Sequence, residues 1–292
     1  MQLSIQKLNK TYPNGVHALR DVTLDIPTGM FGLLGPNGAG KSSLMRTIAT
    51  LQQADSGTIT LGNIDVLQQK DEVRKVLGYL PQEFGLYPRV NAEMLLDHFA
   101  RLKGISSGSE RAQVVKTLLQ RTNLWDHRKK NLGGYSGGMK QRFGIAQALL
   151  GNPRLIIVDE PTAGLDPTER NRFHNLLSEI SENVIVILST HIIEDVQSLC
   201  SNLAIISTGE VRMTGTPLAT VASYRGRVWK KLIDKHELSQ YDRTSLVSNR
   251  LVAGKMEITA VSDSNPDGSF EVAEPTLEDV YFSVVGNSLV GA

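Results

Sequence analysis

The sequence predicts an α/β fold built on a mostly parallel sheet. Short, continuously apolar segments, such as 155–158 and 184–188, have the length of strands that are buried on both faces. These segments alternate with stretches of helical apolar spacing, for example 139–150 and 167–180. A glycine-rich loop at 35–40 joins an apolar strand to a helix. Together these observations indicate helices packed on both faces of the sheet.

The composition is that of an ordinary globular protein. Of the 292 residues, 40% are hydrophobic and 21% are charged, which excludes general disorder. The 31 basic and 30 acidic residues give a net charge of +1, without the basic excess typical of proteins that wrap nucleic acid. The single cysteine, Cys200, forms no internal disulfide and fits a reducing cytosol. No apolar run approaches the roughly 20 residues that span a bilayer, so we expect a cytoplasmic protein whose membrane role depends on a partner.

The first half of the chain changes from strands to helices. Strands are expected at 3–8, 16–26, 30–34, 58–61 and 76–80, and a helix at 42–51. From Asn91 to about Thr122 the apolar spacing is helical, with a loop around Gly104 between two helices. Because this insert interrupts the α/β pattern, we expect a helical subdomain at about 83–152.

The α/β pattern resumes in the second half of the chain. Helices are expected at 139–150, 167–180 and 192–200, and strands at 155–158, 184–188, 203–206 and 211–213. The helix at 167 has a well-specified start, because Asp166 caps it, Pro167 suits its first turn and Glu169 completes a capping box. These elements would complete a first domain, residues 1–222.

A different pattern follows Ser223. Short strands are expected at 228–233, 245–252 and 255–261, before a loop at 262–268. A second capping box, Thr276 to Asp279, opens a last helix. We therefore expect a small α+β appendage at 223–292.

One motif matches the G-x-x-x-x-G-K-[ST] pattern of phosphate-binding loops in full: Gly35, Pro36, Asn37, Gly38, Ala39, Gly40, Lys41 and Ser42. The glycines allow backbone N–H groups to turn toward phosphate oxygens, and the next helix directs the positive end of its dipole at the same anion. Lys41 adds a cation for the terminal phosphates, and the Ser42 hydroxyl is a ligand for Mg²⁺. The alternative, a glycine-rich turn with a surface lysine, is disfavoured by the strand before the loop and the helix after it.

Two acids, Asp159 and Glu160, directly follow the apolar strand 155–158. Neighbouring side chains at the end of a strand point in different directions. We expect Asp159 to hold Mg²⁺, directly or through water, and Glu160 to polarise an attacking water molecule. The alternative is a pair of solvated carboxylates at the start of a loop, which the nearby phosphate loop makes less favourable.

The order of these motifs resembles the ATP-binding subunit of an ABC (ATP-binding cassette) transporter. The resemblance covers about residues 3–220 and depends on the phosphate loop, Gln82, Tyr135-Ser136-Gly137-Gly138-Met139, the segment 155–160, the segment 163–166 and His191. The Ser-Gly-Gly signature is highly specific to that family. The resemblance implies a P-loop NTPase core of the ABC ATPase type, with an N-terminal antiparallel β-subdomain beside the mostly parallel sheet.

The resemblance also implies roles for residues around the nucleotide. Tyr12 would stack on adenine, and Ser43 is counted with the loop as a nucleotide contact. Gln82 would reach Mg²⁺ and the attacking water, and it would link nucleotide state to the helical insert. His191 would contact the γ-phosphate as a switch. A turn tyrosine, a loop glutamine and a structural histidine are the alternatives for these three positions.

The signature segment is expected to act across a dimer interface. Ser136, Gly137 and Gly138 begin a helix and would offer a hydroxyl, N–H groups and a helix dipole to a γ-phosphate. In the family this five-residue segment usually has the sequence Leu-Ser-Gly-Gly-Gln, whereas this chain has Tyr135 and Met139 at its two ends. We expect phosphate contact to survive and a polar contact to be lost at Met139. Asp166 resembles an aspartate that crosses the interface.

The resemblance implies partners and a location. ATP, with Mg²⁺, would be clamped between two copies of the chain and hydrolysed to ADP and phosphate, so a homodimer is the simplest expectation and a heterodimer with a sister chain is the alternative. A loop would contact separate membrane permease chains: Phe84, Gly85, Leu86, Tyr87 and Pro88. The segment 274–282 resembles the ending of bacterial ABC exporter subunits. The protein would then lie peripherally on the cytoplasmic side of the membrane.

Two other functions are alternatives to a transport ATPase. A soluble ABC protein of DNA repair or translation usually carries two cassettes or a long coiled-coil insert, and this chain shows one cassette without sustained heptads. An ABC ATPase that regulates a membrane complex without transport remains the stronger alternative.

Overall fold

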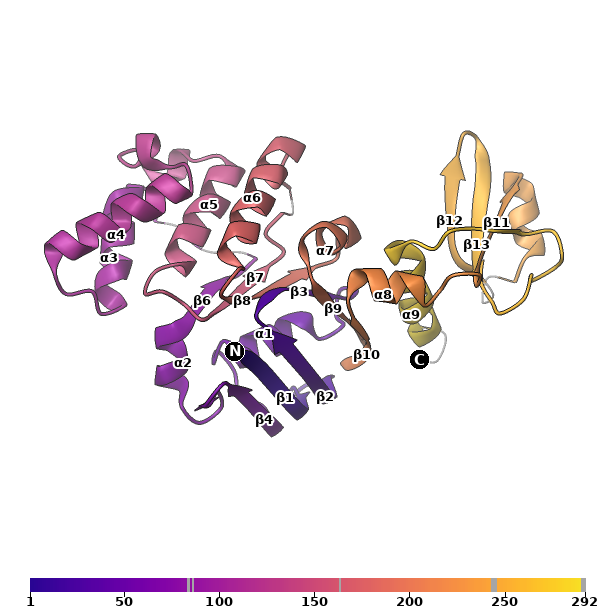
Figure 1. Cartoon of the computed structure of the whole chain (residues 1–292), viewed down its shortest axis with the longest axis horizontal. Coiled ribbons are helices and arrows are strands. Elements are labelled where there is room, and N and C mark those ends of the chain that lie inside the picture. Colours follow the sequence, from indigo (N-terminus) through magenta and orange to yellow (C-terminus); the bar gives the residue numbers. More distant parts are fainter. Residues whose placement is uncertain (83–84, 86, 163, 243–245, 290–292) are drawn as a thin grey trace.

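The computed structural model describes residues 1–82, 85, 87–162, 164–242 and 246–289, which form an α/β core, a helical lobe and a C-terminal sheet (Figure 1). The residues of the sequence predictions that lie outside this described part include Phe84, Leu86, Ala163 and Ser245.

The central sheet has the strand order β10-β9-β3-β8-β7-β6. Its members are β3 (Gly29–Leu34), β6 (Leu77–Leu80), β7 (Leu155–Asp159), β8 (Ile185–Thr190), β9 (Asn202–Ser207) and β10 (Glu210–Gly215). Strands β6, β7, β8, β3 and β9 are parallel, and β10 joins the edge antiparallel to β9. The predicted α/β fold with a mostly parallel sheet is confirmed.

The two faces of this sheet have different coverings. Along β3, Phe31 and Leu33 belong to one buried cluster, whereas Met30 and Leu34 belong to another. This alternation follows from the two-residue period of a strand. The first cluster includes α1 (Lys41–Ile48). Helices α5 (Gly137–Ala148), α6 (Pro167–Ile180) and α7 (Ile193–Leu199) cover the other face.

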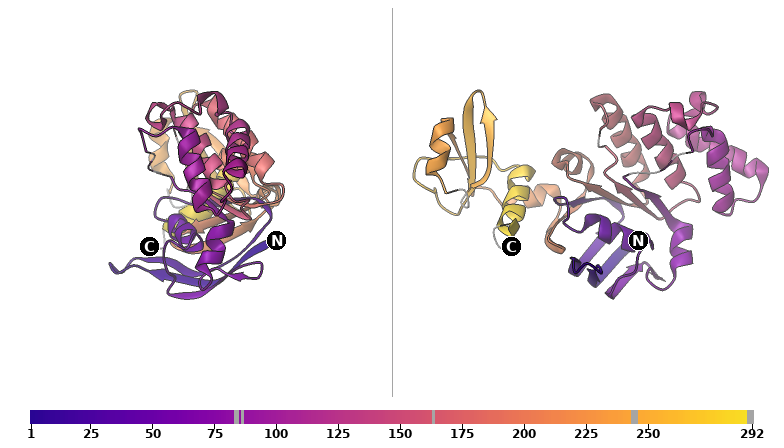
Figure 2. Two further views of the ribbon diagram at one scale, coloured as in Figure 1. Left: turned by 90° about the vertical axis from the view of Figure 1, so that its left-hand side faces the viewer. Right: turned by 180° about the vertical axis from the view of Figure 1, so that it is seen from behind.

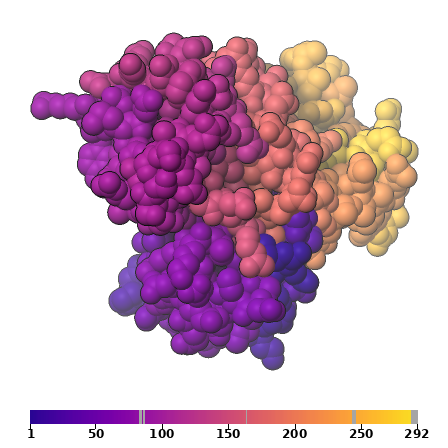
Figure 3. All heavy atoms as spheres, turned by 60° about the vertical axis from the view of Figure 1, so that its left-hand side comes forward, coloured from indigo at the N-terminus to yellow at the C-terminus, as the bar shows by residue number. Residues whose placement is uncertain are grey.

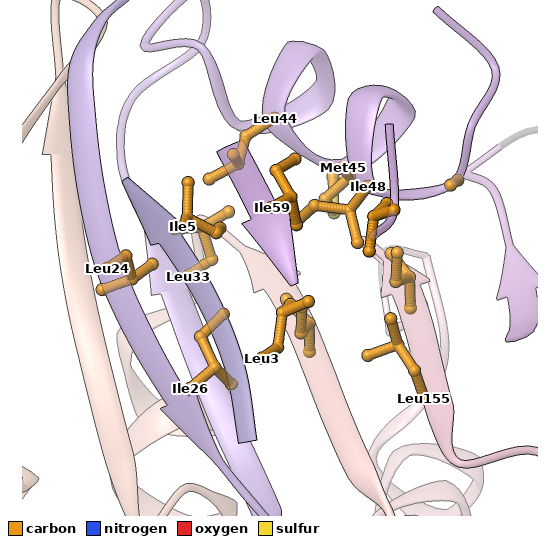
Figure 4. Close-up of a cluster of buried hydrophobic side chains, with 14 of the residues drawn as sticks. Leu3, Ile5, Leu24, Ile26, Leu33, Leu44, Met45, Ile48, Ile59 and Leu155 are labelled. Atoms are coloured by element: carbon orange, nitrogen blue, oxygen red, sulfur yellow. The ribbon is translucent and has the colours of Figure 1, made fainter. Parts of the chain in front are cut away.

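An antiparallel sheet of order β2-β1-β4-β5 covers α1 from the other side. It comprises β1 (Gln2–Thr11), β2 (His17–Pro27), β4 (Ser56–Leu61) and β5 (Ile64–Asp65). Figure 4 shows Ile5 and Ile59 of this sheet beside Leu44 and Ile48 of α1. These side chains are almost completely removed from water, so hydrophobic burial fixes α1, and the loop before it, between two sheets.

The helical lobe has its own buried cluster. Helices α3 (Ala92–Leu102) and α4 (Gly108–Arg121) pack on α5, and Phe143 of α5 is fully buried between them. Side chains of Asn91 and Ser107 cap α3 and α4. In the space-filling view this lobe projects away from the part of the molecule that holds the N-terminal antiparallel sheet (Figure 3).

The chain leaves the core after α8 (Pro217–Ala222) and forms a third sheet, order β12-β13-β11-β14. Its members are β11 (Val228–Ile233), β12 (Leu246–Val252), β13 (Lys255–Val261) and β14 (Glu271–Val272). All of its pairings are antiparallel. Figure 2 shows this sheet set apart from the central one and joined to it through α8 and α9.

The last helix, α9 (Leu277–Leu289), returns to the core. Its Leu277, Val280 and Val285 are buried in the same cluster as side chains of α6 and β8. The predicted capping box is confirmed, since the Thr276 Oγ1 accepts from Asp279 N at 3.2 Å and Thr276 N donates to the Asp279 carboxylate at 2.9 Å. The domain boundary at residue 223 stays a prediction, and this packing leads us to group α9 with the α/β core.

One predicted capping box is wrong. Asp166 does cap α6, because its Oδ1 accepts from Glu169 N at 2.9 Å. The Glu169 carboxylate does not return to the cap, however, because it pairs with Arg142 of α5 and with Arg172. Two arginines attract this carboxylate more strongly than one backbone N–H does.

Among the α-helices and strands of the described residues, four short ones were not predicted: α2 (Lys70–Val76), β5, α8 and β14. Helix α2 buries only Val73, so its sequence carries no apolar period. Helix α8 did carry a signal, because Thr216 caps it and Pro217 follows at the first turn. No helix within the described ranges is long and apolar enough to cross a bilayer.

We predict that Leu277→Ala lowers the free energy of unfolding by about 2–5 kcal/mol, because Leu277 is 0% exposed and its loss leaves a cavity in the core. Urea denaturation measures the change. Leu218→Ala on α8 is the control, since Leu218 is 85% exposed and should change stability by less than about 0.5 kcal/mol. Equal effects of the two substitutions would show that α9 does not stabilise the core.

Candidate functional site

Four parallel strands end at one edge of the central sheet, and each is followed by a predicted site residue. Strand β3 leads into the glycine-rich loop, β6 to Gln82, β7 to Glu160 and β8 to His191. The strands are in register near this edge, with Leu34 opposite Thr190 and Asp159 opposite Ser189. In open α/β sheets this edge is the usual place for a ligand.

The glycine-rich loop is close to the surrounding backbone. Gly38 and Gly40 have φ angles of +79° and +105°, a conformation that favours glycine. A side chain at Gly40 would also collide with the Ala18 carbonyl. The loop ends where α1 begins, and the first N–H groups of a helix have no partners within it. The loop and the helix start therefore offer free backbone N–H groups of the kind that bind phosphate.

Lys41 lies inside this loop. It is 6% exposed, and its Nζ donates to the carbonyls of Gly35 at 2.6 Å and Pro36 at 3.1 Å. Burial lowers the pKa of Lys41, and the carboxylates of Glu160 and Asp159 partly oppose this effect. A cation is thus held at the loop, opposite the two acids.

Asp159 is a buried acid at the end of β7. Burial raises the pKa of its carboxyl group, Glu160 raises it further, and Ser189 and Lys41 act in the opposite direction. The Ser189 hydroxyl is buried near Asp159 without a partner at hydrogen-bonding geometry. A buried carboxylate with a nearby unpaired hydroxyl suits a hard cation, which takes oxygen ligands. Ser42 is exposed at the start of α1, and Gln82 follows β6. Both of these predicted Mg²⁺ ligands thus lie on segments that reach the same edge of the central sheet as Asp159.

Glu160 lies between two predicted site residues. Gln82 Nε2 donates to Glu160 Oε2 at 3.1 Å, and His191 Nδ1 lies 3.1 Å from Glu160 Oε1. The Glu160 side chain is 13% exposed and that of His191 is 52% exposed. The carboxylate is therefore held by side chains from two other strand ends while the site remains open to solvent.

The Glu160 backbone has an unusual conformation. Its φ is +46°, in the left-handed region that glutamate rarely adopts. Glu160 N donates to Ser189 O at 2.9 Å, which continues the pairing of β7 with β8. Such a conformation persists only where surrounding contacts enforce it, and it is common at functional sites.

Tyr12 lies on the turn between β1 and β2, beside the first turns of α1. Its hydroxyl is 3.0 Å from Ser43 Oγ and donates to Gln52 Oε1 at 3.0 Å. Gln52 Nε2 in turn donates to Ser43 O at 2.8 Å. The structure thus joins Tyr12 and Ser43, as two predicted neighbours of the nucleotide. Gln52 was not predicted, because a glutamine after a helix carries no signal of its own.

The signature residues lie in a different part of the chain. Ser136 caps α5 through a hydrogen bond from Met139 N to its Oγ at 3.2 Å, and Ser136 and Gly137 are exposed whereas Gly138 is buried. Among the described residues, no hydrogen bond or ion pair joins Ser136 to the glycine-rich loop. These two predicted phosphate contacts are thus not directly bonded to each other.

The two departures in the signature have a structural reason. Tyr135 is buried, and its hydroxyl donates to His127 O at 2.9 Å inside the helical lobe. Met139 packs against the same cluster. Both side chains thus contribute to the core of the lobe, while the exposed Ser136 and Gly137 remain accessible.

Several known proteins are similar to this chain. Residues 19–163 match the family model for ABC transporters. The chain is 39% identical to the ABC transporter ATP-binding protein NatA of Bacillus subtilis, over 68% of this chain and 82% of that protein. It is 29% identical to the linearmycin resistance ATP-binding protein LnrL of Bacillus subtilis, over 98% of this chain and 99% of that protein.

A solved structure has the same core. The ATP-binding cassette MJ0796, in a dimeric post-hydrolysis state with ADP and Pi, matches with a TM-score of 0.67 and 28% identity. The match covers 73% of this chain and 98% of the cassette. The predicted P-loop NTPase fold, the ATP-binding role and the ATPase activity are thereby confirmed. The chain belongs to the ABC transporter family, as an ATP-binding and ATP-hydrolysing subunit.

Proposed function

We propose that this subunit powers a separate membrane permease by closing on ATP as a dimer and opening after hydrolysis. The observation that carries the proposal is Glu160, held between Gln82 and His191 at the edge where the phosphate loop begins. Glu160 polarises the attacking water, and His191 contacts the γ-phosphate. The glycine-rich loop, with Lys41, cradles the phosphates, and Tyr12 stacks on adenine.

Dimer formation follows from the position of the signature. Because Ser136 and Gly137 are exposed and far along the chain from the loop, they are available to a nucleotide bound by a second copy. The exposed α5 start supplies a helix dipole to that γ-phosphate. The dimeric state of MJ0796 supports this arrangement. Since one chain carries both halves, a homodimer with two working sites is proposed, and a heterodimer is the alternative.

Mg²⁺ is proposed as the second cofactor. Asp159, Ser42 and Gln82 would hold the ion, which supplies charge neutralisation for the phosphates. Among the described residues, no group of three or more histidine, cysteine or acidic side chains is arranged to hold a metal ion. A single buried carboxylate fits Mg²⁺, because this ion takes few protein ligands and shares the nucleotide's phosphate oxygens.

A cleft between the helical lobe and the core suits the permease. Its volume is about 420 Å³, and its lining includes Leu51 and Leu102, which are 55% and 69% exposed. Strand β6 lines the cleft through Tyr79 and leads to Gln82, which contacts Glu160. A permease segment in the cleft would thus sense the nucleotide site. Tyr87, from the predicted permease loop, is also exposed, at 63%.

Export is the proposed direction. A relative whose match covers 98% of this chain, and therefore includes the C-terminal sheet, is a linearmycin resistance ATP-binding protein. A resistance function is consistent with export of a drug-like or lipid-like compound. The subunit would lie peripherally on the cytoplasmic side of the membrane, against its permease. Regulation of a membrane complex without transport is the alternative, and purification with a polytopic partner that moves substrate would exclude it.

Lys41→Ala should weaken ATP binding by about tenfold or more, because a charge-assisted contact to phosphate is lost. Titration with a fluorescent ATP analogue measures the dissociation constant. Lys75→Ala is the matched control, since Lys75 is an exposed lysine on α2. Unchanged affinity in Lys41→Ala would remove this residue from the phosphate site.

Glu160→Gln should bind ATP with near wild-type affinity but turn over at least about a hundredfold more slowly, because the general base is lost. ATP-bound dimer should then accumulate, which size-exclusion chromatography with light scattering detects. Glu182→Gln, at an exposed acid after α6, should behave as the wild type. Wild-type turnover in Glu160→Gln would contradict the proposed mechanism.

Asp159→Asn should raise the melting temperature of the nucleotide-free protein at neutral pH. Burial raises the pKa of Asp159 in the folded state, so its ionised form opposes folding. This penalty is present at pH values above the pKa of Asp159 in the folded state, and it disappears below the pKa of the same group in the unfolded state. The gain in melting temperature should therefore vanish as the pH falls below about 4. Differential scanning fluorimetry with EDTA measures it. The same variant should lose the extra stabilisation that Mg²⁺ adds to ATP.

A further inference from the structure

Asp195 is a buried acid that the proposed mechanism leaves without a role. It lies on α7, four residues after His191, and is 0% exposed. A buried carboxylate is costly unless it is paired and hydrogen-bonded. Asp195 is both, and its partners come from two segments outside α7.

Three side chains surround the Asp195 carboxylate. Thr162 Oγ1 donates to Oδ2 at 2.6 Å, and Arg170 donates to Oδ1 through Nε at 2.7 Å, with its second nitrogen at 2.6 Å. His174 Nε2 lies 2.8 Å from Oδ1, without the angle of a hydrogen bond. We call Asp195, Thr162, Arg170 and His174 the Asp195 clamp.

The Thr162 contact acts on the segment that carries Glu160. Thr162 follows Glu160 by two residues and is 3% exposed. Glu160 itself has a φ of +46°, which surrounding contacts must enforce. The hydrogen bond from Glu160 N to Ser189 O fixes the chain on one side, and the Thr162–Asp195 hydrogen bond fixes it on the other.

The opposite end of the clamp is firmly anchored. Arg170 and His174 lie one turn apart on α6, a helix of 14 residues. Glu169 of the same helix pairs with Arg142 of α5, so α6 is fixed to the signature helix as well. The carboxylate therefore connects the Glu160 segment, the helix after His191 and α6 at one buried point.

We propose that Asp195 is a positioning residue for ATP hydrolysis. Through Thr162 it holds Glu160 in its left-handed conformation, and as part of α7 it holds the turn that carries His191. The Glu160 carboxylate and the His191 ring then remain 3.1 Å apart, the carboxylate placed for the attacking water and the ring for the γ-phosphate. Asp195 itself contacts neither nucleotide nor water. This inference rests on the proposed role of Glu160.

The decisive variant is Thr162→Val, which keeps the shape of the side chain and removes its hydroxyl. We expect turnover at saturating ATP to fall about tenfold or more, because small displacements of a catalytic group are costly. The dissociation constant for ATP should stay within about threefold, since the phosphate loop is untouched. Thr162→Ser retains the hydroxyl and should restore most of the turnover. Steady-state ATPase assays and ATP titration on the full chain give these values.

Asp195→Asn tests the other partner, with Glu194→Gln as its matched control. Glu194 is the neighbouring acid on α7 and is exposed, so its change to an amide should leave turnover unaltered. Asp195→Asn should lower turnover like Thr162→Val. If it fails to fold, as loss of a buried charge partner allows, the Thr162 variants still decide the question.

A double variant separates positioning from a merely structural role. In Glu160→Gln the carboxylate that the clamp positions is already absent, so adding Thr162→Val should reduce turnover no further. Multiplied losses in the double variant, or wild-type turnover in Thr162→Val, would overturn the inference. Wild-type turnover in Glu160→Gln alone would instead refute the proposed role of Glu160, and the inference with it.

Discussion

The site depends on one constraint, the shared direction of four parallel strands. Because β3, β6, β7 and β8 run the same way and pair in register, their carboxyl ends meet at one edge. Residues more than 150 positions apart in the chain, from the glycine-rich loop to His191, are thereby brought together. The two buried clusters on the faces of the sheet stabilise this register, since a slip by one residue would exchange the faces.

At this edge of the sheet, the charges of Lys41 and Asp159 are only partly compensated by other groups of the protein. Burial makes ionised Lys41 and ionised Asp159 less favourable than they are in water, and their mutual attraction offsets this only in part. A nucleotide phosphate and a cation would provide the missing partners. Stability is thus sacrificed in the free protein at the residues proposed to bind, a pattern common at functional sites.

Helix α6 has a central position between the two functional halves of the chain. Its N-terminus is capped by Asp166, its first turn pairs with Arg142 on the signature helix, and Arg170 pairs with Asp195 beside the His191 turn. The half that holds Glu160 and the half that presents Ser136 serve different nucleotides in the proposed dimer. Helix α6 contacts both of these halves through its ion pairs.

The sequence by itself determined the α/β class, the phosphate loop and most strands and helices, because these depend on local spacing: an apolar period, a glycine pattern, a cap. It also indicated Glu160 through the pair of acids at a strand end, and Gln82 and His191 through the family resemblance, and the structure brings these three together. Only the tertiary structure decided that Glu169 pairs with Arg142 instead of closing a capping box, that α9 packs back on the core, and that Asp195 reaches Thr162. Each of these contacts joins segments distant in the chain, and a local pattern carries no information about which buried partner a charged or apolar side chain will find.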